Sequence, residues 1–271
     1  MEIIEVQTEF GPVQFRGTDT GNPILLLITG AFSSEQVMVQ LSARFGKVDV
    51  FRAHLPGNHC PMLIEASVGV FGAAFSAALD QRFPGRDVVL VGLSVGALVG
   101  FSMRSPAVRA IVAIEPPLLM REAWPLEVLR EQAPPGQEAL LWNVLGIGPD
   151  RVEDRDYRPL ISDRRVPTFV LLGDEPPEPG TVWVEMPGLV GAESRRALHA
   201  SRRVEVKVIT GAGHHIVRSD PLEVVSAIRH ALIVGLEPAR AALTMPLGQV
   251  MPPAWSPVAR HSSQADGETP Q

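Results

Sequence analysis

The sequence predicts an α/β fold: a mostly parallel central sheet with helices on both faces. Short, mostly uncharged runs alternate along the chain with segments whose apolar residues recur at helical spacing. Alternation of this kind is typical of parallel strands joined by crossover helices. The chain has 271 residues, of which 45% are hydrophobic, so one large core is possible and we expect a single domain over residues 1–245.

The expected strands are short and rich in β-branched residues. The first two, 2–8 and 12–16, are predicted to form an antiparallel edge hairpin around Gly11-Pro12. Buried strands are then expected at 23–29, 47–53, 87–92, 109–115, 167–173 and 203–210.

Helices are expected between these strands. Ser33 and Gln36 have the spacing of a capping box, which predicts a helix that begins at Ser33 and presents one apolar face, made of Val37, Leu41 and Phe45. Apolar residues at helical spacing predict a second helix over 67–82. A short third helix runs through residue 104.

The last helix has clear start and stop signals. Asp220 is the expected N-cap, Pro221 occupies the first helical position, and Glu223 lies in the first turn. Gly235 is expected to end this helix.

Two regions break the alternation. Residues 116–165 are Pro-rich and apolar, which predicts either a helical, lid-like insertion or an ordinary helical excursion packed on the core. Residues 246–271 are rich in Pro, Ser, Gln and Gly and are expected to form a disordered tail.

Residues Val88–Met103 form a run of sixteen uncharged, mostly apolar residues, with Ser94 in its middle. A membrane helix needs about 20 apolar residues, and the β-branched segment Val88–Val91 favours a buried strand instead. The pattern Gly92-Leu93-Ser94-Val95-Gly96 then falls between a strand and a helix. That context predicts a nucleophile elbow, in which a sharp turn exposes the serine hydroxyl. The alternative is a tight Gly-Ser turn without chemistry.

Around this motif the chain resembles the α/β-hydrolase superfamily over about residues 20–235. The resembling segments, in the family's order, are ILLLITGAFSS, FRAHLPGNHCP, VLVGLSVGALVGF, VPTFVLLGDEPP and VITGAGHHIVRSDPLEVVSAI. The resemblance implies an α/β-hydrolase fold and a catalytic Ser94 with His214 as its general base; His215 is the alternative base.

The resemblance also implies an oxyanion hole made of backbone N–H groups. Val95 follows the nucleophile and supplies one donor, and Ala31 supplies the second, with Phe32 as its alternative. Many members of the family have His-Gly where this chain has Thr29-Gly30. The backbone donors can survive that change.

The acid of the triad is less clear from the sequence. The usual family position, three residues after Gly173, is Pro176, which has no carboxylate. Asp174 and Glu175 are close to that position. Glu115, at the end of the preceding strand, resembles the acid of type I thioesterases and is the preferred candidate.

Composition narrows the classes of partner. The net charge is −6 and no basic stripe alternates with aromatic residues, so a nucleic-acid partner is not expected. The single cysteine, Cys60, excludes an intramolecular disulfide and a cysteine-based zinc site, and neither a metal nor a cofactor is expected. The first residues do not resemble a signal peptide, so we expect a cytoplasmic protein without a membrane span.

These observations predict a serine hydrolase that cleaves a small-molecule ester or thioester, including an acyl group on a carrier. Two alternatives remain open. The same fold supports lyases, C–C hydrolases and cofactor-free haloperoxidases, and it can also serve as a non-catalytic binding module.

Overall fold

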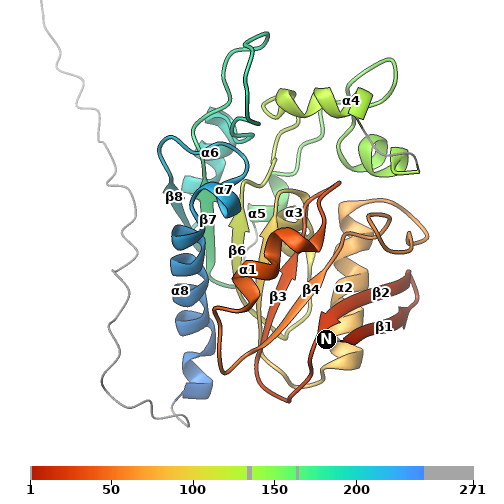
Figure 1. The fold of residues 1–271 in the computed structure, drawn as a ribbon, viewed down its shortest axis with the longest axis vertical. Coiled ribbons are helices and arrows are strands. Elements are labelled where there is room, and N and C mark those ends of the chain that lie inside the picture. Colours follow the sequence, from red (N-terminus) through yellow and green to blue (C-terminus); the bar gives the residue numbers. More distant parts are fainter. Residues whose placement is uncertain (1, 133–135, 163–164, 241–271) are drawn as a thin grey trace, which may run out of the picture.

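The computed structural model describes residues 2–132, 136–162 and 165–240. They form one eight-stranded sheet in the order β1-β2-β4-β3-β5-β6-β7-β8 (Figure 1). The first hairpin is antiparallel, β2 also pairs antiparallel with β4, and all strands from β4 across to β8 run parallel. The predicted α/β architecture is therefore confirmed. The expected tail, 246–271, lies outside the described residues.

Every predicted strand is present, with ends shifted by at most two residues. The bounds are β1 Glu2–Thr8, β2 Gly11–Gly17, β3 Ile24–Ile28, β4 Asp49–Ala53, β5 Val88–Leu93, β6 Val108–Ile114, β7 Thr168–Leu172 and β8 Val204–Val208. All residues of β3, β5 and β7 are buried. These strands read as continuous apolar runs because helices cover both faces of the sheet.

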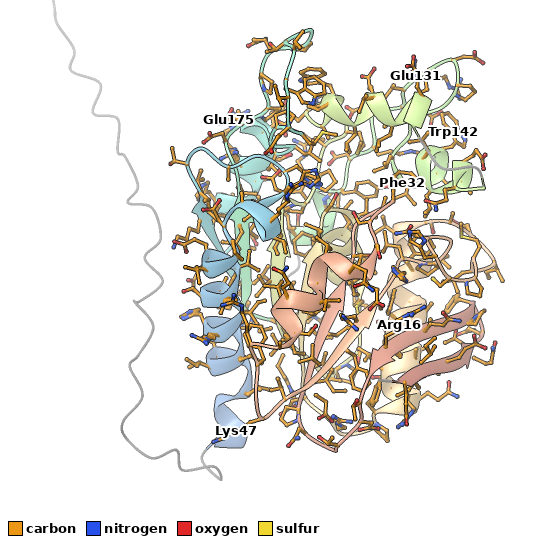
Figure 2. All side chains as sticks on the ribbon, in the orientation of Figure 1. Arg16, Phe32, Lys47, Glu131, Trp142 and Glu175 are labelled. Atoms are coloured by element: carbon orange, nitrogen blue, oxygen red, sulfur yellow. The ribbon has the colours of Figure 1, made fainter. Side chains whose placement is uncertain are left out.

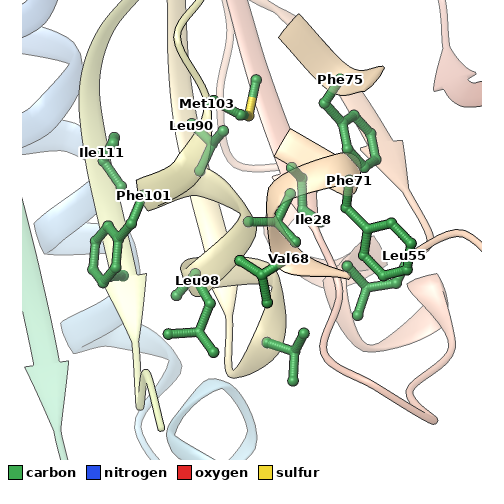
Figure 3. Close-up of a cluster of buried hydrophobic side chains, with 14 of the residues drawn as sticks. Ile28, Leu55, Val68, Phe71, Phe75, Leu90, Leu98, Phe101, Met103 and Ile111 are labelled. Atoms are coloured by element: carbon green, nitrogen blue, oxygen red, sulfur yellow. The ribbon is translucent and has the colours of Figure 1, made fainter. Parts of the chain in front are cut away.

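Successive side chains of the central strands point into two separate cores. Leu90 packs with α2 (Val68–Arg82) and α3 (Val95–Ser102), where Phe71 and Phe101 are fully buried (Figure 3). On the other face, Val89 and Val91 pack with α8 (Pro221–Arg240) and with the segment before α1. The period of two along each strand thus separates the two helical layers.

The helix after β3 differs from the prediction. Its N-cap is Ser34, not Ser33: Ser34 has an extended backbone and its hydroxyl accepts the N–H of Gln36. A 3₁₀ turn, η1 (Glu35–Met38), leads into a single turn of α1 (Val39–Ser42). The predicted capping box was wrong because Ser33 belongs to a tight turn, in which its N–H donates to Gly30 O.

The last helix begins at Pro221, as predicted, but Gly235 does not end it. α8 continues to Arg240. A Cβ at Gly235 would lie 3.0 Å from Cβ of Ala110 in β6. The glycine therefore lets the helix lie close against the sheet, a tertiary role that local stop signals cannot distinguish from a C-cap.

The described part of the insertion 116–165 contains short helical segments. They are η2 (Trp124–Val128), α4 (Leu129–Gln132), η3 (Leu140–Val144) and α5 (Pro159–Ser162). Of these, α4 lies above the sheet in Figure 1 and α5 lies lower, before the start of β7. The Glu122 carboxylate accepts the N–H groups of Glu193 and Ser194 at the start of α6 (Ala192–Ala200). The insertion is thus attached to the body. Its opening as a lid remains a prediction.

Within the described residues, no helix is both long and apolar enough to cross a bilayer. The uncharged run around Ser94 is divided between β5 and α3, as predicted.

Candidate active site

Ser94 lies at a sharp turn between β5 and α3. Its backbone has φ 54° and ψ −120°, a combination that a residue with a side chain rarely adopts. A Cβ at Gly92 would lie 2.5 Å from the nitrogen of Ala97, and a Cβ at Gly96 would lie 2.5 Å from Thr29 O. Both glycines are therefore needed for strand, helix and neighbouring loop to meet at this turn.

Glu115 follows β6 and is fully buried. Its backbone also lies in the left-handed region, with φ 49°. One carboxylate oxygen accepts the N–H of Gly173 and the other accepts the N–H of Leu189, both at 2.7 Å. Two backbone donors thus hold the carboxylate in one orientation and compensate for its loss of water.

His214 lies in the loop after β8, with 8% of its surface exposed. Its Nδ1 is buried without a hydrogen bond and lies 3.6 Å from Oε2 of Glu115. The backbone N–H of His214 donates to Met186 O, 3.0 Å away. The exposed His215 immediately precedes the short helix α7 (Ile216–Ser219).

The other two candidate acids contact different groups. Oδ2 of Asp174 accepts the N–H of Gly211 and so braces the turn before His214. Glu175 is 56% exposed in its side chain and lies 3.8 Å from Arg195. Of the three carboxylates, Glu115 is the one that the structure brings beside the imidazole.

Backbone hydrogen bonds align the segments that carry these residues. The N–H of Ser94 donates to Ile114 O, at the end of the neighbouring strand, over 2.8 Å. The N–H of Asp174 donates to Ala212 O over 2.8 Å and connects the loops after β7 and β8. Ser94, Glu115 and His214 therefore all lie at the carboxyl edge of the sheet, although up to 120 residues separate them in the sequence.

The turn over residues 30–33 lies against the serine. A Cβ at Gly30 would lie 3.1 Å from Cβ of Ser94. In the described part of the chain, the backbone N–H groups of Ala31, Phe32 and Val95 donate no recorded hydrogen bond. Three donors that could face an oxyanion are thus available next to Ser94. Figure 2 shows Phe32 at the end of the body that faces the insertion segment with Trp142.

Thr29 stands where many family members have histidine. It is fully buried, and its N–H donates to Ala53 O in β4, 3.1 Å away. The backbone that enters the turn therefore stays in register with β4, although the residue at this position is threonine and not histidine.

Sequence reasoning assigned no role to several groups around this site. Asn58 is fully buried and its Nδ2 donates to the carbonyl oxygens of Gly30 and Ser33. The Leu189 N–H and the Met186 carbonyl are backbone groups, for which no residue type gives a signal. Asn58 did have a signal in the sequence, because it lies inside the family-like segment FRAHLPGNHCP.

Two further titratable groups nearby have structural environments. Burial and the charges of His59, Arg16 and Arg52 lower the pKa of His54 to about 4, and its neutral Nε2 accepts the N–H of Glu35 at 2.9 Å. Burial raises the pKa of the Cys60 thiol to about 11. A thiol with that pKa is not a nucleophile at neutral pH.

Comparison with known proteins agrees with this architecture. A sequence model described as the alpha/beta hydrolase family matches residues 25–228. No match was found among curated proteins.

Solved structures share the fold at low sequence identity. A thermophilic esterase from Thermogutta terrifontis is 16% identical, with a TM-score of 0.60 over 86% of this chain and 98% of its own. The N-acyl homoserine lactonase AidH is 18% identical, with a TM-score of 0.59 over 92% and 100%. A thioesterase domain from the curacin biosynthetic pathway is 16% identical, with a TM-score of 0.58 over 84% and 99%.

The family match extends over most of the described strands and includes Ser94, Glu115 and His214. The chain therefore belongs to the alpha/beta hydrolase family.

Proposed function

We propose that this hydrolase is a serine hydrolase that cleaves a carboxylic ester or thioester through an acyl-enzyme on Ser94. Two observations carry the proposal: the buried pair of Glu115 and His214, whose Oε2 and Nδ1 atoms are 3.6 Å apart, and the strained turn of Ser94 at the end of β5, the strand next to β6. A serine hydroxyl becomes a good nucleophile when a neighbouring imidazole accepts its proton.

The first half of the reaction forms the acyl-enzyme. Oγ of Ser94 bonds to the acyl carbon while its proton passes to Nε2 of His214. The carbonyl electron pair moves onto the oxygen, which accepts hydrogen bonds from the N–H groups of Ala31 and Val95. The bond to the alkoxide or thiolate then breaks, and the leaving group takes the proton from His214.

The second half releases the acid. Water gives a proton to His214 and bonds to the acyl carbon, and collapse of the second intermediate returns the proton to Oγ of Ser94. Glu115 stabilises the imidazolium in both halves and fixes the ring orientation without taking the proton itself.

Glu115 is the proposed acid rather than Asp174 or Glu175. Its carboxylate is buried, is oriented by two backbone donors, and lies beside Nδ1 of His214. Asp174 is exposed and already accepts the N–H of Gly211.

The proposed substrate has an apolar acyl or alcohol part. Phe32 and Met186 are half-buried apolar residues, and they belong to the two segments that contact Ser94 and His214. The similar solved structures include an esterase, a lactonase and a thioesterase domain. A small-molecule ester, a lactone, which is a cyclic ester, and a carrier-bound thioester are therefore the substrates to test.

The test compares hydrolysis of p-nitrophenyl esters and acyl thioesters of short and medium chain length. We expect turnover by the wild-type protein and none by Ser94→Ala, with the better series identifying the ester or thioester class. Equal, negligible rates for both folded proteins would contradict the proposal.

A further inference from the structure

The turn next to Ser94 contains a strained residue. Gly30 O accepts the N–H of Ser33 at 3.4 Å, which closes a β-turn over residues 30–33. Its third residue, Phe32, has φ 59°, in the left-handed region that glycine or asparagine usually occupies in such turns. This backbone is strained for a bulky residue, so it persists only where the surroundings hold it.

One side chain holds both ends of this turn. Nδ2 of Asn58 donates to Gly30 O at 3.3 Å and to Ser33 O at 2.8 Å. The first and last carbonyl groups of the turn are therefore bound to a single amide nitrogen. Asn58 is fully buried, and its bond to Gly30 O is buried while its bond to Ser33 O is partly buried.

The backbone around Asn58 is itself fixed. Its N–H donates to Leu55 O at 2.9 Å in the segment that follows β4. β4 pairs in parallel with β3, the strand that leads into the turn. Asn58 follows the end of β4, and the two carbonyl groups that it binds follow the end of β3, which pairs with β4 in a defined register.

The amide oxygen of Asn58 shows that this arrangement lowers the stability of the fold. Oδ1 of Asn58 is buried and has no hydrogen-bond partner among the described residues. An unsatisfied buried acceptor is destabilising, so stability alone does not explain an asparagine at this position. The two donated bonds explain it if the geometry of the turn matters for function.

We propose that Asn58 is a positioning residue that holds the 30–33 turn so that the Ala31 N–H faces the reacting acyl oxygen. This inference rests on the proposed function. Since the oxyanion forms during the reaction, loss of the clamp should lower kcat and leave KM nearly unchanged. Asn58 acts through the turn and does not touch the substrate.

The principal variant is Asn58→Asp, which places an oxygen where Nδ2 donates. We expect kcat for a p-nitrophenyl ester to fall roughly 100-fold, as for loss of one oxyanion donor, with KM within about threefold of wild type. The matched control is Asn22→Asp. Asn22 is exposed, precedes β3 at the opposite end of the sheet, and donates from Nδ2 to Thr20 and, at 3.4 Å, to Oδ1 of Asp49. Its replacement by Asp brings a carboxylate close to Asp49 and so lowers stability, but kcat should not change.

A double-mutant cycle separates positioning from general instability. Glycine adopts positive φ without strain, so a Phe32→Gly turn needs the clamp less. We expect the fold-loss of kcat caused by Asn58→Asp to be at least about fivefold smaller in the Phe32→Gly background than in the wild-type background. Equal losses in both backgrounds, or a wild-type kcat in Asn58→Asp, would overturn the inference.

The wild-type protein supplies the test that does not depend on folding of the variants. In a crystal structure of its fluorophosphonate adduct, we expect Asn58 Nδ2 bonded to both turn carbonyls and the phosphonyl oxygen bonded to the Ala31 N–H. An adduct in which either contact is missing overturns the inference alone. A folded wild-type protein that does not react with the probe overturns the proposed function as well, so the two failures are distinguishable.

Discussion

Oε2 of Glu115 lies 3.6 Å from Nδ1 of His214, and the backbone N–H groups of Gly173 and Leu189 hold the same carboxylate. The four groups come from the ends of two neighbouring strands and from the loops after β7 and β8. This relationship is why we propose Glu115 as the acid among the three candidates, and the proposal can be tested by mutation.

Glu115→Gln should lower kcat by roughly 10³-fold or more, because an amide cannot stabilise the imidazolium in the way a carboxylate does. Asp174→Asn should retain nearly full activity, since the amide oxygen can still accept the N–H of Gly211. Steady-state rates on one ester, with far-UV circular dichroism as the control for folding, decide between the acids. A severe loss in Asp174→Asn with an active Glu115→Gln would exchange their roles.

His54 should make the free energy of unfolding depend on pH. Its pKa is about 4 in the folded protein against an ordinary 6.5, so the unfolded chain binds more protons between these values. The stabilisation is complete above about pH 6.5 and is lost as the pH falls toward 4, by up to roughly 3 kcal/mol. Protonation also removes the acceptor for the N–H of Glu35.

Denaturant unfolding of wild type and His54→Gln at pH 4.5, 5.5 and 7 measures this contribution. Glutamine offers an oxygen acceptor but does not titrate, so the variant should lose less stability between pH 7 and 4.5. Parallel pH profiles in the two proteins would assign the dependence to other groups.

Gly96→Ala should destabilise the protein by about 1–3 kcal/mol, because the new methyl group would overlap Thr29 O at 2.5 Å. Gly69 in α2 is the matched control. A Cβ there would meet nothing within 4 Å, so Gly69→Ala should be neutral or stabilising by up to about 1 kcal/mol. Thermal unfolding of both variants gives the comparison, and equal stabilities would show that the turn at Ser94 has room for a side chain.

Cys60 should be inert in the folded protein. Its Sγ–H donates to Leu55 O at 3.2 Å, and burial raises the pKa of the thiol to about 11. We expect iodoacetamide at pH 7.5 to modify Cys60 only after denaturant is added, and Cys60→Ser to keep its activity. Rapid alkylation of the native protein with loss of activity would contradict this interpretation.

The strands and the turn at Ser94 were predictable because their signals are local. Short apolar runs rich in β-branched residues, and a small-residue turn between strand and helix, depend on residues a few positions apart. Gly235 was misread for the same reason: a glycine that ends a helix and one that packs against Ala110 are identical in sequence. Ser33 and Ser34 are also identical residue types, and only Ser33 belongs to the turn that Asn58 binds.

The acid and the positioning residue depend on tertiary contacts. The Glu115 carboxylate accepts hydrogen bonds from backbone N–H groups that are 58 and 74 residues away in the sequence. No local sequence pattern predicts such contacts. Asn58 lies in a quoted family-like segment, but its role follows from contacts with a turn 25 and 28 residues earlier. Residue types therefore identify candidates for a site, and tertiary contacts determine which of the candidates lie together.

The central claim is that Ser94 is a nucleophile activated by His214. The most direct measurement is the reaction of folded wild-type protein with a fluorophosphonate, followed by peptide mass spectrometry. We expect one adduct on Ser94, none in Ser94→Ala, and labelling slowed at least about 100-fold in His214→Asn. A folded wild-type protein that is not labelled, or one labelled equally well after Ser94→Ala, would contradict it.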